Sequence, residues 1–150
     1  MKTRRTDFSV IIPVFNEQEV VHELYERIRN TVAPLSENYE IIFINDGSRD
    51  LSLMRILELT KKDNRVFYLN FSRNFGHQIA VTAGLDVCNG DAVVIIDGDL
   101  QDPPELIADL YRKYKEGYEV VYARREERKG ESLFKKLTAR IFYRVLKKMT

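Results

Sequence analysis

Two aspartates separated by a glycine follow an apolar run, and they are the residues of this 150-residue chain best suited to chemistry. The apolar run covers residues 92–96, and the triplet is Asp97, Gly98 and Asp99. Carboxylate and amide oxygens are the hard ligands that Mg²⁺ or Mn²⁺ prefers, and such ions are often shared with substrate phosphates. The pattern therefore predicts a site for a metal ion and a diphosphate.

The same triplet also suits an ordinary turn, because Asp and Gly both favour turns for local hydrogen-bonding or positive-φ reasons. The residues on either side favour a ligand site instead. A buried strand is expected to lead into the triplet, and Pro103 with Pro104 stops a strand and can open a helix. Open α/β sheets bind ligands at such strand-to-helix junctions.

Apolar, β-rich runs alternate with helical patterns along the whole chain. The expected strands cover residues 8–14, 39–45, 66–71, 92–97 and 119–123. The expected helices cover residues 17–32, 51–62, 76–87, 104–116 and a last segment from about residue 132. This alternation predicts an α/β domain with a mostly parallel sheet and helices on both faces.

In such a sheet the residues that follow the strands share one edge, where a ligand crevice belongs. Polar residues follow every expected strand. After the second strand, Asp46 suits a nucleobase N–H or a ribose hydroxyl, and Ser48 or Asp50 is expected to cap the next helix. After the third, Arg73 suits a diphosphate, while His77 at a helix start is either a structural hydrogen-bonding residue or a catalytic one.

Missing motifs exclude several classes of protein. No Gly-x-Gly-x-x-Gly follows the first strand and no Gly-x-x-x-x-Gly-Lys is present, so neither a nicotinamide or flavin enzyme nor a P-loop ATPase is expected. There is no Cys and His cluster for zinc and no Gly-x-Ser-x-Gly for a serine nucleophile. The single Cys88 cannot form an internal disulfide, which fits a reducing compartment.

The net charge of +1 conceals an uneven distribution. Residues 124–148 carry ten Lys or Arg against three Glu, so this segment is +7 and the rest of the chain is −6. Such a division points to an anionic partner for the basic end.

Four ordered segments resemble the motifs of family 2 glycosyltransferases of the GT-A fold, in the branch of polyprenyl-phosphate glycosyltransferases. The segments are residues 8–17, 45–50, 73–76 and 97–105, and the resemblance extends over essentially all 150 residues. It implies that the nucleoside of a nucleotide-sugar is bound by Pro13, Asn16, Glu17, Asp46 and Ser48. It also implies that Asp97 contacts the ribose or the metal, and that Asp99 with Gln101 holds Mg²⁺ or Mn²⁺ against the diphosphate.

The resemblance further implies a polyprenyl phosphate acceptor, held by Arg125 and Arg128 and attacking in a single inverting displacement. An anionic acceptor of this kind needs little help from a general base. The bacterial members of the branch favour a UDP-sugar, although the residues themselves leave the sugar and the base open. An acceptor that is soluble or a polysaccharide is an alternative, as is a non-catalytic nucleotide-binding module.

The basic end predicts a membrane contact. We expect a GT-A core over residues 1–128 and a basic amphipathic helix over 129–150. In the helix, residues 132–149 carry an apolar face opposite a basic one, a pattern of helices in an anionic membrane interface and also of a surface helix packed on its own domain. A nucleic acid partner is not expected, because no binding module is recognisable.

These features lead us to expect a protein at the cytoplasmic face of a bacterial inner membrane. No run of 18 apolar residues is present to cross that membrane. Enzymes of the resembled branch continue with further acceptor-side elements, so we expect the chain to be C-terminally truncated. The oligomeric state is left open, with a homo-oligomer as one option.

Overall fold

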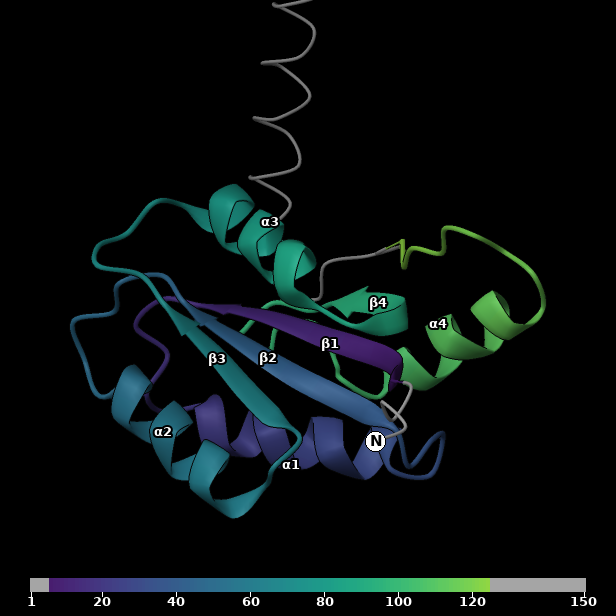
Figure 1. Cartoon of the computed structure of the whole chain (residues 1–150), viewed down its shortest axis with the longest axis horizontal. Helices are drawn as coiled ribbons and strands as arrows, with labels where there is room; N and C mark the ends of the chain where they lie inside the picture. The colour runs from purple at the N-terminus through teal and green to yellow at the C-terminus, as the bar shows by residue number, and fades with distance from the viewer. Residues whose placement is uncertain (1–5, 125–150) are drawn as a thin grey trace, which may run out of the picture.

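The computed structural model describes residues 6–124, in which strands and helices alternate (Figure 1). The strands are β1 (Thr6–Val14), β2 (Tyr39–Asn45), β3 (Val66–Asn70) and β4 (Gly90–Ile95). The helices are α1 (Val21–Val32), α2 (Ser52–Lys62), α3 (His77–Val87) and α4 (Leu106–Lys115). The predicted elements are confirmed over this part of the chain, with ends shifted by a few residues, except for the fifth strand.

The four strands form one parallel sheet in the order β3-β2-β1-β4. In the register of the sheet, Val10 of β1 pairs with Ile41 of β2 on one side and with Val94 of β4 on the other. Every residue of β2 is buried, as expected for a parallel strand covered on both sides. The carboxyl ends of all four strands therefore meet at one edge of the sheet.

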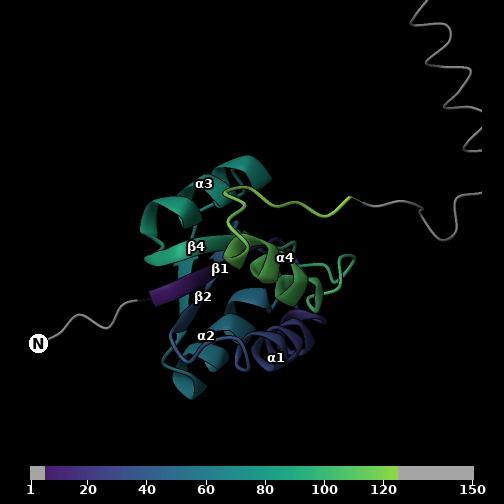
Figure 2. The same ribbon diagram turned by 90° about the vertical axis from the view of Figure 1, so that its right-hand side faces the viewer.

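Helices cover both faces of the sheet, as Figure 2 shows. One face packs against α1, α2 and α4, and its core includes Phe8, Val10 and Ile12 of β1 with Leu24 and Ile28 of α1, all of them 0% exposed. Burial of these apolar side chains supplies the main driving force for folding, at about 25 cal/mol per Å². The predicted α/β architecture is thereby confirmed.

The opposite face packs against α3. Ile11, Ile42 and Ile44 contact Ala80 of this helix. A Cβ atom on Gly84 would lie only 2.5 Å from Cγ2 of Ile11, so the absence of a side chain there allows α3 to approach β1 closely. This contact sets the position of the first residue of α3 above the carboxyl edge of the sheet.

The strand predicted over residues 119–123 is wrong. These residues follow the turn at Gly117, which has a φ of +103°, and they pair with no strand of the described chain. Val120 and Tyr122 are 83% and 81% exposed. A β-rich pattern forms a strand only where a neighbouring strand supplies hydrogen bonds, and within residues 6–124 the outer edge of β4 has no such neighbour.

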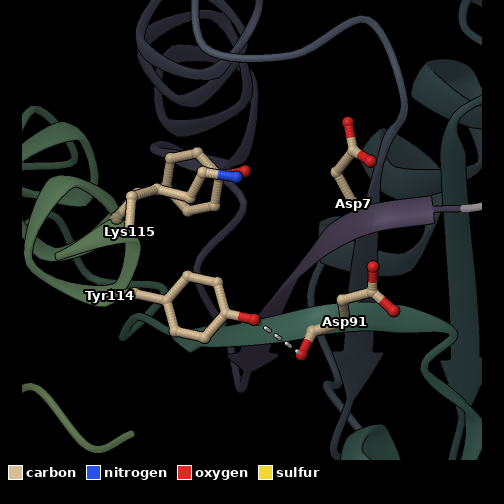
Figure 3. A pocket seen from close by; sticks show the side chains of 5 residues that line it. Asp7, Asp91, Tyr114 and Lys115 are labelled. Atoms are coloured by element: carbon tan, nitrogen blue, oxygen red, sulfur yellow. Dashed lines mark hydrogen bonds between the residues drawn. The ribbon is translucent and has the colours of Figure 1, made fainter. Parts of the chain in front are cut away.

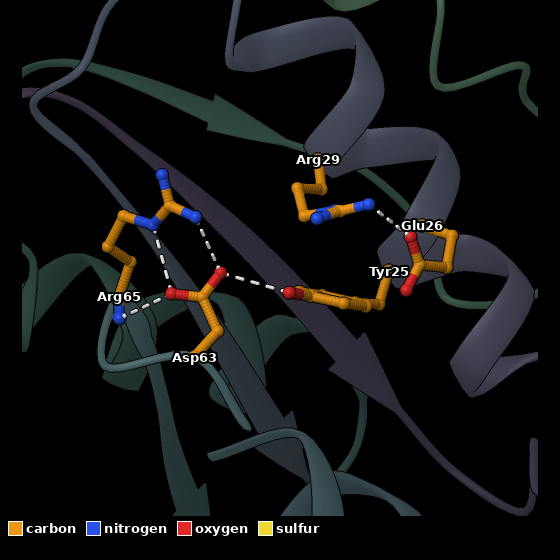
Figure 4. Close-up of polar contacts among 5 residues, drawn as sticks. All are labelled: Tyr25, Glu26, Arg29, Asp63 and Arg65. Atoms are coloured by element: carbon orange, nitrogen blue, oxygen red, sulfur yellow. Dashed lines mark hydrogen bonds and ion pairs between the residues drawn. The ribbon is translucent and has the colours of Figure 1, made fainter. Parts of the chain in front are cut away.

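A buried carboxylate ties α1 to the turn between α2 and β3 (Figure 4). Asp63 accepts hydrogen bonds from Nε and Nη2 of Arg65, both at 2.9 Å, and from the Tyr25 hydroxyl at 2.9 Å. Burial opposes ionisation of Asp63, but the bonds from Arg65 and Tyr25 prevail and lower its pKa to about 2. Burial and the bond to Asp63 raise the pKa of Tyr25 to about 12.

A second buried network joins β1, β2 and the start of β4. Glu40 accepts hydrogen bonds from the Ser9 hydroxyl and from the backbone N–H of Asn89, each at 2.6 Å. Ser9 in turn accepts the N–H of Gly90 at 2.9 Å. The polar groups of this region are thus satisfied inside an otherwise apolar sheet.

The predicted basic helix of residues 129–150 lies outside the described residues. Within residues 6–124, no helix is long and apolar enough to cross a membrane.

Candidate active site at the carboxyl edge of the sheet

The loops that follow β1 and β2 are bound to each other by side chains from both. The N–H of Asn16 donates to Oγ of Ser48 at 2.9 Å, and the N–H of Arg49 donates to Oδ1 of Asn16 at 2.8 Å. The N–H of Glu17 donates to Oγ of Ser52 at 2.8 Å. Asn16 has a φ of 58°, in the left-handed region that asparagine tolerates better than most residues. The predicted residues Asn16, Glu17 and Ser48 are therefore brought together.

Asp50 adds a further bond between these loops. Its carboxylate accepts the N–H of Gln18 at 3.1 Å and the N–H of Ser52, the first residue of α2, at 2.9 Å. Burial opposes ionisation, but the bonds from Ser52 and Gln18 outweigh it and lower the pKa of Asp50. Of the two residues expected to cap α2, Asp50 accepts a hydrogen bond at the start of the helix. Its hydrogen bond with Gln18, in the loop after β1, was not predicted.

Asp46 is buried and directs its carboxylate toward the loop between β3 and α3. Only 3% of this residue is exposed. Its two oxygens accept the backbone N–H groups of Phe75 at 2.7 Å and of Gly76 at 2.9 Å. The side chain predicted to bind a nucleoside thus has backbone donors on both oxygens.

Gly47 allows the loop after β2 to contact the loop after β3 directly. It has a φ of +66°, and a Cβ atom there would lie 2.3 Å from the carbonyl carbon of Arg73 and 2.5 Å from the nitrogen of Asn74. The Arg73 guanidinium lies 4.6 Å from the centre of the Phe75 ring, a cation–π contact on the exposed surface of the loop. Within residues 6–124, Arg73 forms no ion pair with a carboxylate, and its exposed side chain is accessible to an anionic ligand.

Asp97 lies just beyond β4 and close to the start of α3. Its Oδ1 is 3.8 Å from Nε2 of His77, and the two side chains are 53% and 59% exposed. The triplet therefore stands at the carboxyl edge, as predicted. Between its two carboxylates, Gly98 is buried, and a Cβ atom there would lie 2.7 Å from the carbonyl oxygen of Pro13. Pro13 itself is buried within β1.

Asp99 is held by the backbone that follows it. Its Oδ1 accepts the N–H of Gln101 at 3.0 Å, a local turn consistent with the alternative interpretation of the triplet, and the Gln101 side chain is exposed. Burial, with repulsion from Asp99 and Asp50, raises the pKa of Glu17. Negative charge is thus concentrated where the first and fourth strands end.

The donors at this edge fit a hard divalent cation. Asp97 and Asp99 offer carboxylate oxygens and Gln101 an amide oxygen, a set that suits Mg²⁺ or Mn²⁺ when substrate phosphates complete the coordination. Within residues 6–124, no group of three or more His, Cys, Asp or Glu side chains could hold a metal ion by itself. A cation here would also offset the repulsion that Glu17 experiences.

A pocket at the other end of the sheet lies away from this edge. A pocket of about 280 Å³ is shown in Figure 3, lined by Asp7, Asp91, Tyr111, Tyr114 and Lys115. Asp7 and Asp91 belong to the amino-terminal parts of β1 and β4, so this pocket is at the opposite end of the strands. Arg125 and Arg128, predicted to bind the acceptor, lie outside the described residues.

The chain matches the family model described as glycosyl transferase family 2 over residues 9–150. It is 54% identical over 148 residues to the uncharacterized glycosyltransferase YkcC of Bacillus subtilis, covering 99% of this chain and 46% of that protein. It is 42% identical over 142 residues to the prophage bactoprenol glucosyl transferase homolog of Escherichia coli, covering 95% of this chain and 46% of the relative. The chain thus spans about half the length of these relatives.

Solved glycosyltransferase structures share the fold. The mannosyltransferase PcManGT from Pyrobaculum calidifontis, in complex with GDP-Man and Mn²⁺, matches 73% of this chain and 32% of its own, with a TM-score of 0.63 and 21% identity. TarS 1-349 of S. aureus, in complex with UDP-GlcNAc, matches 71% of this chain and 32% of its own, with a TM-score of 0.56 and 24% identity. The chain belongs to glycosyl transferase family 2, and its described part has the GT-A fold.

Proposed function

We propose that the full-length protein transfers a sugar from a nucleotide-sugar, with UDP as the expected nucleotide, to a polyprenyl phosphate. The observation that carries this proposal is the 42% identity to proteins named bactoprenol glucosyl transferase, in a chain whose acidic triplet follows β4 at the carboxyl edge of the sheet. In the transfer, a phosphate oxygen of the acceptor bonds to the anomeric carbon as its bond to the nucleoside diphosphate breaks. The single displacement inverts that carbon.

The donor would occupy the loops that follow β1, β2 and β3. The residues that line the nucleoside pocket would be Pro13, Asn16, Glu17, Asp46 and Ser48. Exposed Arg73 would contact the diphosphate through charge-assisted hydrogen bonds.

Asp97, Asp99 and Gln101 would hold Mg²⁺ or Mn²⁺ at the diphosphate, with Asp97 also able to reach the ribose. When bound, the ion would neutralise the charge that develops on the leaving group. These side chains would orient the donor so that its anomeric carbon faces the acceptor.

The acceptor would be held by Arg125 and Arg128, whose planar guanidinium groups suit bidentate contact with phosphate. Residues 129–150 would form a helix separate from the core of residues 1–128, with residues 132–149 in contact with anionic lipid. Electrostatic attraction there is worth about 1 kcal/mol per Lys or Arg near the surface. The protein would then act at the cytoplasmic face of a bacterial inner membrane.

The test uses full-length protein, Mn²⁺, a panel of radiolabelled nucleotide-sugars and undecaprenyl phosphate. We expect label from one donor to enter the lipid extract. Loss of an outer-shell partner of a metal ligand typically lowers metal affinity or activity ~10–100-fold. Asp99→Asn alters a proposed direct ligand, so it should reduce sugar transfer by at least roughly 100-fold. Asp109→Asn is the matched control, because Asp109 is an exposed carboxylate of α4 that, within residues 6–124, forms an ion pair with Arg112 alone.

Transfer of label from a donor to a water-soluble or polysaccharide product, with none in the lipid extract, would refute the lipid acceptor and favour a soluble or polysaccharide one. UDP binding without transfer to any acceptor would favour a non-catalytic module. Unchanged transfer by Asp99→Asn would refute the metal-binding role.

A further inference from the structure

Leu100 has a backbone conformation that leucine rarely adopts. Its φ is 58°, in the left-handed region, where the Cβ atom of an L-residue crowds the following carbonyl oxygen. Among the non-glycine residues of positions 6–124, Asn16 alone shares a positive φ, and asparagine tolerates it better than most residues. Backbone strain of this kind persists only where the surrounding structure holds it, and it is frequent at functional sites.

The side chain of Leu100 supplies the stabilisation that the strained backbone needs. It is partly buried and packs against the apolar cluster on the α1, α2 and α4 side of the sheet, whose members include Val14, Ile96 and Ile107. Removing apolar area from water is favourable, so burial of this side chain offsets the cost of the left-handed backbone. Leu100 is thus an apolar anchor in a polar loop.

Further contacts with the protein define the turn around this anchor. Gly98 lies so close to β1 that a Cβ atom there would be 2.7 Å from the carbonyl oxygen of Pro13. Oδ1 of Asp99 accepts the N–H of Gln101 at 3.0 Å, in a turn with Leu100 at its centre. The backbone of Leu100 therefore determines how the two residues beside it are placed relative to each other.

The turn leaves both of these residues able to bind a cation. An ionised carboxylate has about four lone-pair positions, and the N–H of Gln101 occupies one of those on Asp99. The side chain of Gln101 is exposed. Carboxylate and amide oxygens are thereby presented from the two sides of one anchored residue.

We propose that Leu100 is a positioning residue for the metal-bound diphosphate, a role that rests on the function proposed above. Its packing holds the left-handed turn in which Asp99 and Gln101 offer their oxygens to Mg²⁺ or Mn²⁺ together. The apolar side chain has no atom that could coordinate the ion, so it acts through geometry, and small displacements of a ligand group weaken binding. Core packing thus organises the loop before the donor binds.

The experiment measures UDP binding to full-length protein by calorimetry, with and without Mn²⁺. Leu100→Ala removes the anchor, so it should weaken Mn²⁺-dependent UDP binding about 10-fold and change metal-free UDP binding less than about 2-fold. Leu100→Gly accepts the left-handed backbone but also lacks the anchor, and should bind as weakly as Leu100→Ala. Leu100→Met keeps a side chain of similar volume and should retain most of the affinity.

Leu35→Ala is the matched control. Leu35 is another partly buried leucine that packs against the same apolar cluster, but it lies between α1 and β2, at the amino end of the sheet. Its truncation should lower the free energy of unfolding without changing UDP binding. If Leu100→Ala does not fold, Leu100→Gly, which avoids the backbone strain, replaces it in the comparison.

Hydrogen exchange supplies a readout that does not depend on the proposed function. Leu100→Ala should speed exchange in residues 98–102, whereas Leu35→Ala should not, and unchanged exchange in Leu100→Ala would refute the anchoring role. Normal Mn²⁺-dependent binding by Leu100→Gly, or an equal loss of UDP binding with and without Mn²⁺ in Leu100→Ala, would refute the positioning role. Absence of UDP binding by the unaltered protein would refute the proposed function separately.

Discussion

Gly47→Ala should lower the free energy of unfolding by roughly 2–5 kcal/mol and disrupt the contact between the loops after β2 and β3. Two costs combine at this position. An alanine with a left-handed φ costs about 1–2 kcal/mol, and Gly47 has a φ of +66°. Inserting a methyl group into filled space costs about 1–3 kcal/mol more, and the new Cβ would lie 2.3 Å from the backbone of Arg73.

The contribution of the collision can be separated from that of backbone strain. Gly117 also has a positive φ, of +103°, but a Cβ atom there would meet nothing within 4 Å. Gly117→Ala should therefore cost only about 1–2 kcal/mol. Urea unfolding of the full-length protein, followed by circular dichroism, compares the two variants and the unaltered chain.

The comparison also has a functional readout. Gly47→Ala should weaken Mn²⁺-dependent UDP binding, because the loop that leads to His77 must move away, whereas Gly117→Ala should not. Equal destabilisation by the two substitutions would refute the close approach of the loops. Normal UDP binding by a destabilised Gly47→Ala protein would show that the loop contact serves folding alone.

Two further predictions concern buried carboxylates. Asp63 has a pKa of about 2 in the folded protein, against 3.8 for the free side chain. Its ionised form should therefore add about 2 kcal/mol to the free energy of unfolding above pH 4, and this contribution should be lost as the pH falls toward 2. Acid unfolding should show this loss in the unaltered protein, and a pH profile that is the same in Asp63→Asn would contradict it. Glu40→Ala should cost about 2–3 kcal/mol in urea unfolding by leaving Ser9 and Asn89 without an acceptor, whereas Glu40→Gln, which keeps one oxygen, should cost under about 1 kcal/mol. Equal costs for the two Glu40 variants would refute that explanation.

The central part of the sheet could be predicted because strands β1 and β2 are buried on both faces. The second strand was predicted over residues 39–45, and β2 has the same bounds. The apolar residues 41–44 follow one another without a break, as in a parallel strand buried on both faces, and they lack the alternation of apolar and polar residues that marks a half-exposed strand. The placement of Asp97 and Asp99 at the carboxyl edge followed from the end of the apolar run over residues 92–96.

The error over residues 119–123 has a physical origin. Val120 and Tyr122 have side chains that favour strands, but that preference acts only where a neighbour completes the hydrogen-bond ladder. The described chain brings no strand alongside them. Pairing partners far away in sequence leave no trace in a local pattern.

The internal bonds of the site were beyond prediction for a related reason. Asp46 binds backbone N–H groups of Phe75 and Gly76, and every residue but proline carries such a group. The residue types in the sequence therefore do not indicate which backbone N–H groups will bind the Asp46 carboxylate. The pair of His77 and Asp97 depends in turn on how closely α3 approaches β1.

The central place of β1 has a consequence for synthesis of the protein. Among the four strands of the described sheet, β1 is made first and its neighbour β2 follows closely, but β4, which pairs with its other side, begins only at Gly90. Until then, one side of an apolar strand offers unpaired N–H and C=O groups, a template for association with other chains. Sheets with such distant pairings fold slowly, so the nascent chain should depend on chaperones during the interval before β4 emerges.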